Sequence, residues 1–196
     1  MTGILIAFEG LDQSGKETQA ARLREQFAAA GRTVRALSFP DYDTPIGREI
    51  RAALNGDRDF AADTLQLLYI ANRHEYRQAI QDWLAAGDVV VCDRYRASSI
   101  AYGEAQGLDS VWLHDVQRHL PVPTVVFLLD IAPEEAARRK AHGRDKFERD
   151  LPLLSRVRDS YRRQAAGEGW EVIDASKSKE DIAADILARL KDRQLL

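Results

Sequence analysis

A glycine-rich loop that ends in a lysine is the segment whose residue types and spacing most clearly suggest chemistry. Residues 10–18 read Gly-Leu-Asp-Gln-Ser-Gly-Lys-Glu-Thr and directly follow an apolar run. They match the G-x-x-x-x-G-K pattern of a phosphate-binding loop (P-loop), whose backbone N–H groups and lysine contact the phosphates of a nucleotide. We therefore expect Lys16 to be catalytic and the whole loop to bind ATP, through Gly10, Leu11, Asp12, Gln13, Ser14, Gly15, Lys16, Glu17 and Thr18.

One position of the loop departs from the pattern, because Glu17 stands where Ser or Thr usually binds magnesium. A carboxylate could hold Mg²⁺ directly or through water, since this ion prefers oxygen ligands and keeps several waters. Its charge would also repel the phosphates, and Thr18 or Asp93 could bind the ion instead. Glu17 and Asp93 are the predicted metal ligands, and a binding protein without turnover remains an alternative.

An acidic residue followed by an arginine forms a second candidate group. Residues 89–95 read Val-Val-Val-Cys-Asp-Arg-Tyr, so Asp93 stands at the end of a predicted buried strand. Ligands of open parallel sheets bind at the carboxyl ends of the strands. The planar guanidinium of Arg94 suits a pair of phosphate oxygens. Asp93 could alternatively cap the following helix, but its place beside Arg94 in a chain with a P-loop favours a role in the site.

The apolar runs predict the elements that position these residues. Residues 4–8, 89–92, 124–130 and 171–173 read as strands, with a weaker fifth at 33–39. Longer amphipathic segments separate them, among them residues 16–30, 62–86 and 179–193. Strands that are apolar on both faces and alternate with helices indicate a parallel sheet covered by helices on both sides. We therefore expect a three-layer α/β fold.

Composition limits the class of protein. The 196 residues are 45% hydrophobic and carry 28 basic against 31 acidic side chains, for a net charge of -3. This predicts a single domain, 1–196, without a nucleic acid partner. The apolar runs have strand length, whereas a membrane helix needs roughly 20 residues. With no leader pattern and the lone Cys92, we expect a cytoplasmic protein without a membrane partner.

Several segments together resemble the thymidylate kinase family over nearly the full chain. These segments are Phe8-Glu-Gly-Leu-Asp12, Phe39-Pro40, Leu68-Tyr-Ile-Ala-Asn-Arg73, Asp93-Arg-Tyr95 with Ser98 and Tyr102, and Gly143-Arg-Asp-Lys-Phe-Glu148. The resemblance implies a P-loop kinase fold with a five-stranded sheet and a short lid at residues 138–150. It also implies a nucleoside monophosphate kinase that converts dTMP to dTDP with MgATP by direct in-line transfer. A homodimer packed through helices is implied as well.

The resemblance also assigns roles to single residues. Asp12 would accept a hydrogen bond from the 3′-hydroxyl of the deoxyribose, and Arg94 would bind the acceptor phosphate. Tyr69 would stack on thymine, Arg73, at i+4, would bond the pyrimidine edge, and Phe39 would line the base pocket. Without the resemblance, the two aromatic residues would read as core and Arg73 as surface.

The remaining substrate contacts are implied in the same way. Tyr42 and Tyr102 would border the sugar and phosphate, whereas Ser98 and Ser99 would lie against the base. Tyr42 stands in the turn-like sequence Asp-Tyr-Asp-Thr-Pro, where it would otherwise be an ordinary loop residue.

The source of a catalytic arginine is a separate question. Relatives of the eukaryotic type carry an arginine at the position of Gln13, and others supply the cation from the lid. Here the lid and the helix before it carry the positive charges, with Arg139 and Arg144 as the first candidates and several others that could serve solubility alone. The remaining cations are Arg138, Lys140, Lys146 and Arg149; Asp145 and Glu148 would form salt bridges that shape the lid.

A deoxynucleoside kinase remains open as a rival function, beside the kinase-like binding protein made inert by Glu17 and Gln13. A deoxynucleoside kinase would use Asp93 as a base towards an uncharged hydroxyl group, and would phosphorylate thymidine rather than dTMP. A nucleotide-dependent switch would need an N-K-x-D base-recognition motif, which the sequence lacks.

Overall fold

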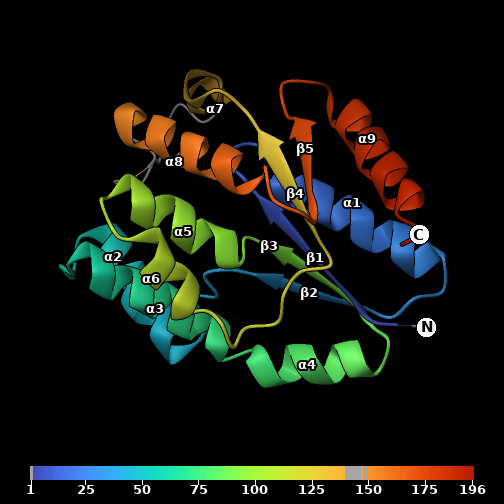
Figure 1. Cartoon of the computed structure of the whole chain (residues 1–196), viewed down its shortest axis with the longest axis horizontal. Coiled ribbons are helices and arrows are strands. Elements are labelled where there is room, and N and C mark those ends of the chain that lie inside the picture. The colour runs from blue at the N-terminus through green and yellow to red at the C-terminus, as the bar shows by residue number, and fades with distance from the viewer. Residues whose placement is uncertain (1, 140–146, 148–149) are drawn as a thin grey trace.

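The computed structural model describes residues 2–139, 147 and 150–196. Its sheet contains five parallel strands in the order β2-β3-β1-β4-β5, with β1 at the centre (Figure 1). The predicted α/β class and parallel sheet are thus confirmed, and each predicted strand differs from the observed one by a single residue at one or both ends. The strands are β1 (Ile4–Glu9), β2 (Val34–Ser38), β3 (Val89–Asp93), β4 (Val125–Asp130) and β5 (Trp170–Asp174).

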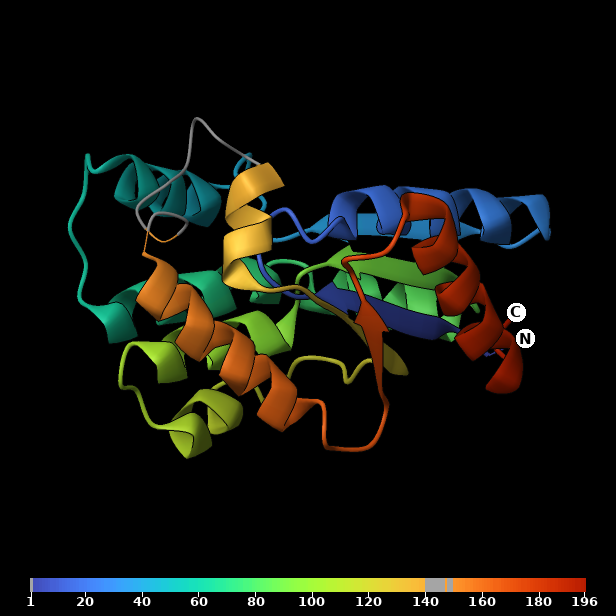
Figure 2. The same ribbon diagram turned by 90° about the horizontal axis from the view of Figure 1, so that it is seen from above.

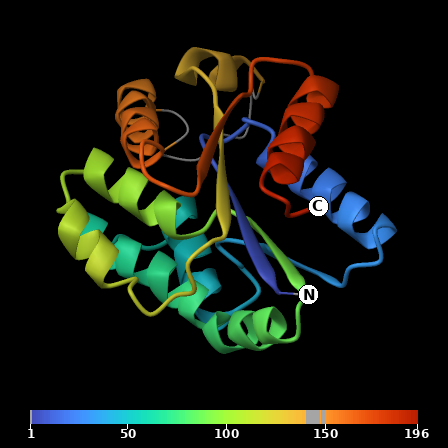
Figure 3. The same ribbon diagram turned by 45° about the vertical axis from the view of Figure 1, so that its right-hand side comes forward.

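Helices cover both faces of this sheet. Figure 3 shows α1 and α9 on one side, and α3, α4 and α5 on the other. The helices are α1 (Lys16–Ala29), α2 (Pro45–Asn55), α3 (Ala62–His74), α4 (Arg77–Ala85), α5 (Arg96–Ala105), α6 (Ser110–Asp115), α7 (Pro133–Arg139), α8 (Leu151–Gln164) and α9 (Lys179–Asp192).

The central strand shows why both faces are apolar. Ile4, Ile6 and Phe8 pack into the core on one side of the sheet, and Leu5 and Ala7 pack into the core on the other. Alternate side chains of a strand point to opposite faces, so a strand buried on both sides must be apolar throughout. The two cores hold β1 in place, and its carboxyl end leads into the P-loop.

The predicted helical run over residues 62–86 is wrong as one helix, because α3 ends at His74 and α4 begins at Arg77. The Tyr76 hydroxyl bonds the Asp41 carboxylate, and its ring packs edge-on against Phe39 at 5.7 Å between centroids. Both partners lie more than thirty residues earlier in the chain. A contact of this range is invisible to helical periodicity, and here it overrides local propensity.

The predicted lid lies largely outside the described residues. Only Arg138, Arg139, Phe147 and Asp150 of residues 138–150 belong to the described part, and Arg144, Asp145 and Glu148 do not. Asp150 caps α8, since its side chain accepts a hydrogen bond from the Leu153 backbone at 2.9 Å. Within the described ranges, no helix combines the length and apolarity needed to cross a bilayer.

Candidate active site

The P-loop joins the end of β1 to the start of α1 through strained backbone. Gly10 has φ 134° and Gly15 has φ 97°, and a Cβ on Gly10 would lie 2.5 Å from the Leu129 carbonyl oxygen. Glycine is required at position 10 on both grounds. The loop therefore has the predicted strand-loop-helix context, with backbone N–H groups at the positive end of α1.

Lys16 is almost fully buried in this loop, and its Nζ donates to the Leu11 carbonyl at 2.8 Å. Burial, and then the charge of nearby Arg94, lowers the pKa of Lys16, although neighbouring carboxylates act in the opposite direction. An ammonium group whose charge is disfavoured by burial gains from an anionic ligand. The electrostatics therefore suit a phosphate group beside Lys16.

A cavity of about 760 Å³ opens over the loop. Its wall joins the P-loop to the segment after β5 and the start of α9, which the sequence reasoning did not assign to the site. Ser178 caps α9, so the sequence indicated a helix start there, but no pattern indicated that it faces a cavity. The lining residues are Asp12 to Gln19, Ser38, Phe39, Pro40, Tyr42, Asp93, Arg94, Arg139, Lys177, Ser178, Lys179 and Ile182.

Arg139 reaches this cavity from α7. Its Nη1 donates to the Gln13 carbonyl at 3.2 Å and its Nη2 donates to the Ala175 carbonyl at 2.9 Å. Figure 2 shows α7 beside the loop that leads into α1. One of the two predicted catalytic arginines therefore lies at the P-loop. The other, Arg144, lies outside the described residues.

The two predicted metal ligands line the same cavity. Asp93 Oδ1 is buried and has no hydrogen-bond partner in the described part of the chain, whereas Glu17 is exposed in the first turn of α1. Among the described residues, no group of three or more His, Cys, Asp or Glu side chains could hold an ion. An ion held by one or two carboxylates, waters and phosphates fits this donor set, and Mg²⁺ is commonly bound in that way.

The alternative role of Asp93 as a helix cap receives no support. Helix α5 begins at Arg96 with Tyr95, not Asp93, at its N-cap, and the Tyr95 side chain itself makes no capping hydrogen bond. Asp93 Oδ1 has no hydrogen-bond partner within the described residues.

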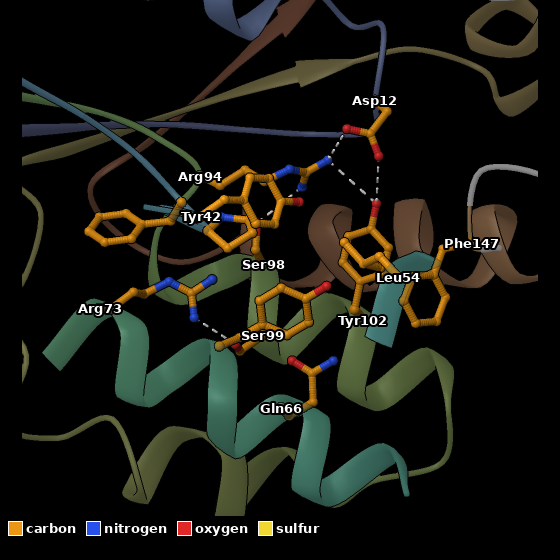
Figure 4. A pocket seen from close by; sticks show the side chains of 13 residues that line it. Asp12, Tyr42, Leu54, Gln66, Arg73, Arg94, Ser98, Ser99, Tyr102 and Phe147 are labelled. Carbon is orange, nitrogen blue, oxygen red and sulfur yellow. Dashed lines mark hydrogen bonds and ion pairs between the residues drawn. The ribbon is translucent and has the colours of Figure 1, made fainter. Parts of the chain in front are cut away.

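A second, narrower cavity of about 100 Å³ adjoins the first and contains every predicted substrate contact (Figure 4). The two cavities share Asp12, Phe39, Pro40, Tyr42 and Arg94 as a common wall. Pro40, Leu54, Gln66 and Phe147 also line it and were missed. The predicted residues in its lining are Asp12, Phe39, Tyr42, Tyr69, Arg73, Arg94, Ser98, Ser99 and Tyr102.

Arg73, on α3, defines one end of the narrow cavity. Its Nη1 donates to Ser99 Oγ at 2.7 Å, and its guanidinium lies 6.0 Å from the centre of the Phe39 ring. The side chain is 2% exposed, and burial lowers its pKa. Its Nε has no hydrogen-bond partner among residues 2–139, 147 and 150–196. A buried guanidinium with unused donors suits a ligand that carries acceptor oxygens.

The same end carries an amide that sequence reasoning overlooked. Gln66 lies seven residues before Arg73 on α3, and such spacing puts both side chains on one face of the helix. Figure 4 shows the Gln66 amide at the end of the cavity opposite Asp12. A glutamine at a helical position carries no sequence signal for a ligand, which explains the omission.

Arg94 and Asp12 define the other end. Arg94 Nη2 donates to Asp12 Oδ1 at 2.8 Å in a partly buried ion pair, and the Arg94 guanidinium lies 5.4 Å from the centre of the Tyr102 ring. Burial, the largest single effect, would lower the pKa of Arg94, but the charge and hydrogen bond of Asp12 together with Tyr102 and Tyr161 raise that pKa. The backbone of Arg94 has φ 62°, which non-glycine residues adopt rarely and often at functional sites.

A buried asparagine fixes the segment that carries Tyr42. Asn72 Oδ1 accepts a hydrogen bond from the Asp41 backbone N–H at 2.8 Å, and its Nδ2 donates to Thr44 Oγ1 at 2.9 Å. The Arg51 guanidinium stacks on Tyr42 at 4.7 Å from the ring centre. Helices α2 and α3 thus hold the turn that follows β2 over the narrow cavity.

A family model described as thymidylate kinase matches residues 8–186. The thymidylate kinase of Arabidopsis thaliana is 37% identical over 94% of this chain and 69% of its own length, and that of Homo sapiens is 32% identical over 97% and 91%. A probable thymidylate kinase of Pyrococcus abyssi is 36% identical over 100% and 99%. The solved thymidylate kinase of Candida albicans superposes with a TM-score of 0.85 at 28% identity, covering 99% of this chain and 93% of that one.

Proposed function

Since this chain belongs to the thymidylate kinase family, we propose that its two adjoining cavities bind ATP and dTMP and align them for phosphoryl transfer. The protein is a nucleoside monophosphate kinase that phosphorylates dTMP to dTDP with ATP. The narrow cavity is the observation that carries the assignment of residues. The Asp12–Arg94 pair lies at one end of it, next to the P-loop, and Arg73 lies at the other end.

ATP occupies the larger cavity in this proposal. The backbone N–H groups of residues 10–18 surround its phosphates, and Lys16 neutralises the outer ones. The nucleoside part extends towards the start of α9, where Lys177, Ser178 and Ile182 line the cavity. The burial that disfavours the Lys16 charge supports this assignment, because a triphosphate beside Lys16 would stabilise that charge.

dTMP occupies the narrow cavity with its base at the Arg73 end. Tyr69 stacks on the pyrimidine, Phe39 lines the pocket, and Arg73 donates to a carbonyl oxygen of the base edge. Ser99 lies against the base and orients Arg73, since it already accepts a hydrogen bond from that side chain.

The sugar and phosphate lie at the opposite end. Arg94 binds the acceptor phosphate, Asp12 accepts a hydrogen bond from the 3′-hydroxyl, and Tyr42 and Tyr102 border them. Ser98 lines the cavity beside Arg94 and bonds its guanidinium at 3.1 Å, so its contact with the substrate lies nearer the phosphate than the resemblance implied.

Magnesium completes the proposed site. Asp93 and Glu17 hold Mg²⁺ or its waters, and the ion would neutralise charge on the phosphates of ATP. Asp93 Oδ1 is buried and has no hydrogen-bond partner among the described residues, which supports this role. A buried acceptor without a partner costs free energy unless a ligand satisfies it.

The reaction in this site is a direct in-line transfer without a covalent intermediate. The protein contributes position and charge: Lys16 and Arg94 hold the two phosphates, and Arg139 neutralises charge on the transferring group. Arg144 is a further candidate for this last role. A lid over residues 138–150 would close the site and exclude water, which otherwise competes with dTMP as the acceptor.

The proposed setting is a homodimer in the cytoplasm. The family resemblance suggests packing through helices, and Leu67 of α3, whose side chain is 43% exposed, is an apolar residue available for such contact. Light scattering coupled to gel filtration tests the homodimer, and a mass of one chain would contradict it.

The experiment that tests the function is a coupled assay of ADP formation from MgATP, with dTMP, dUMP, AMP and thymidine as separate acceptors. We expect rapid turnover with dTMP and little with AMP or thymidine. Turnover of thymidine but not dTMP would instead indicate a deoxynucleoside kinase. A parallel assay of Glu17→Ser tests the metal site: recovery of an otherwise silent enzyme by this substitution would mean that Glu17 blocks catalysis.

A further inference from the structure

We propose that Glu9 and Tyr161, residues outside the substrate cavity, are positioning residues that hold the Arg94 guanidinium where it binds the acceptor phosphate. The proposal rests on the proposed function, in which Arg94 contacts dTMP. Sequence reasoning used Glu9 only as part of the family resemblance and gave Tyr161 no role.

Glu9 is the last residue of β1 and is fully buried. Its Oε1 accepts hydrogen bonds from the backbone N–H groups of Tyr95 at 2.8 Å and Ser98 at 3.3 Å. These donors belong to the start of α5. The side chain of the N-cap residue, Tyr95, makes no capping hydrogen bond there. The carboxylate of a neighbouring strand thus caps α5 and fixes the segment that follows Arg94.

The second oxygen of Glu9 gathers two hydroxyl groups. Ser98 Oγ donates to Glu9 Oε2 at 2.6 Å, and the Tyr161 hydroxyl donates to the same oxygen at 3.0 Å. The Ser98 and Tyr161 oxygens lie 2.8 Å apart. β1, α5 and α8 therefore meet in one buried triangle of oxygen atoms.

The hydrogen bonds to Glu9 set the orientation of the two hydroxyl groups, so that both present an acceptor oxygen to Arg94. A hydroxyl group can both donate and accept hydrogen bonds. When the hydroxyl donates its hydrogen to a carboxylate, the lone pairs of the hydroxyl oxygen remain available to accept from another donor. Arg94 Nη1 uses them, donating to Ser98 Oγ at 3.1 Å and to the Tyr161 oxygen at 3.2 Å. Burial and the Glu9 charge raise the pKa of Tyr161, so this phenol keeps its proton.

Both ends of the guanidinium are thereby held. Nη1 is fixed by the triangle and Nη2 by Asp12 at 2.8 Å, which sets the plane of the group. A planar guanidinium loses less entropy on binding a phosphate when its plane is already set. Without these hydrogen bonds the Arg94 guanidinium would rotate within the cavity, and binding of the acceptor phosphate would have to include the entropy cost of fixing it.

The alternative reading is that the triangle only packs α5 and α8 against the sheet. Tyr161→Phe separates the two readings, because it removes one oxygen and keeps the ring. We expect the dissociation constant for dTMP, measured by calorimetry on the full chain, to rise about tenfold. The inhibition constant of thymidine, which has no phosphate, should stay within about twofold, as should the KM for ATP. An equal loss for dTMP and thymidine, or no loss for either, would overturn the proposal.

Tyr95→Phe is the matched control. Tyr95 is also fully buried, and its hydroxyl has no hydrogen-bond partner among the described residues. Loss of this hydroxyl should leave the affinity for dTMP within about twofold of the wild type. If both Tyr→Phe variants weakened dTMP binding alike, the effect would belong to loss of any buried phenol, and the proposal would fail.

A double-mutant cycle with Arg94→Ala tests the pathway through the arginine. In that background Tyr161→Phe should cost no further dTMP affinity, whereas full additivity would show that Tyr161 acts elsewhere and would overturn the proposal. Glu9→Gln should weaken dTMP binding at least as much as Tyr161→Phe, since its amide must present a donor either to α5 or to the hydroxyl groups. A wild type that fails to bind dTMP at all would overturn the proposed function itself, which these variants do not address.

Discussion

Two adjacent arginines of α7 differ sharply in their surroundings. Arg139 donates to carbonyl groups of the P-loop and of the segment after β5, whereas Arg138 is 74% exposed and pairs with Glu135 on its own helix. We expect Arg139→Ala to lower kcat for dTMP about a thousandfold, because a cation beside the transferring phosphoryl group stabilises charge in the transition state. Steady-state kinetics measures the change, and Arg138→Ala, which should stay within about twofold, is the control. Equal effects of both variants would contradict a specific role for Arg139.

Lys16 carries a charge that burial disfavours. Lys16→Met should therefore abolish turnover while leaving the unfolding midpoint at pH 7 unchanged or higher. The folded-state pKa of Lys16 is lowered, so between that value and the usual 10.5 the unfolded chain binds more protons. In this window the wild type gains stability as the pH rises, and the variant should lack this part of the gain. Urea denaturation of both proteins from pH 7 to 10 measures the difference, and parallel curves would contradict the burial argument.

The residues found from sequence and those missed differ in the kind of signal they carry. The P-loop follows β1 and the Asp93-Arg94 pair stands at the carboxyl end of β3, and the residue types at both places indicate their chemistry. Gln66 and Leu54 stand at ordinary helical positions, so nothing local distinguishes them from packing residues. Tyr161 contributes one oxygen to a group assembled from three elements, and contacts of that kind appear only in the folded chain.

Helix α8 is anchored to the sheet by a strand-end carboxylate. Asp130, at the end of β4, accepts hydrogen bonds from Arg158 at 2.7 and 3.0 Å and from Arg162 at 2.7 and 3.2 Å. We expect Asp130→Asn to lower the free energy of unfolding by about 2 kcal/mol, since it weakens partly buried, charge-assisted bonds. Asp115→Asn, which breaks an exposed pair with Arg118, should cost no more than about 0.5 kcal/mol. Urea denaturation at pH 7 compares the two, and similar losses would contradict the anchor.

The same carboxylate gives this anchor a pH dependence. Burial opposes the charge of Asp130, but the hydrogen bonds from Arg158 and Arg162 outweigh it and lower the pKa below 3.8. A group with a lowered folded-state pKa contributes stability above its usual value and loses it as the pH falls through the lowered one. The difference in stability between wild type and Asp130→Asn should therefore narrow as the pH falls below about 4.

Element boundaries were predictable where local patterns decide them and not where tertiary contacts do. The five strands follow from apolar runs, and Pro133 marks the start of α7. The break between α3 and α4 lies at Tyr76, whose hydroxyl bonds Asp41 far earlier in the chain. Helix α2 begins at a Thr44 cap followed by Pro45, a start signal that the sequence reading passed over.

At the scale of the whole molecule, the thermal stabilisation that each ligand gives tests where its parts bind in the narrow cavity. A ligand that binds only the folded chain stabilises it, by about 2.7 kcal/mol at a hundredfold excess over its dissociation constant. We expect dTMP to raise the melting temperature more than the same concentration of thymidine does, because only dTMP uses the Arg94 end. Differential scanning fluorimetry measures both shifts, and Arg94→Ala should bring the dTMP shift down to that of thymidine. An unchanged dTMP shift in that variant would contradict the placement of the phosphate.

The narrow cavity has ends built by different parts of the chain. Arg94 and Asp12 follow the central strands β3 and β1. Arg73, Tyr69 and Gln66 belong instead to α3, a helix that covers one face of the sheet. Descent with modification can therefore act on the two ends at different rates. Drift along α3 would change which nucleobase is accepted and leave the transfer machinery intact, so a new substrate preference could be inherited through a handful of codons in one helix.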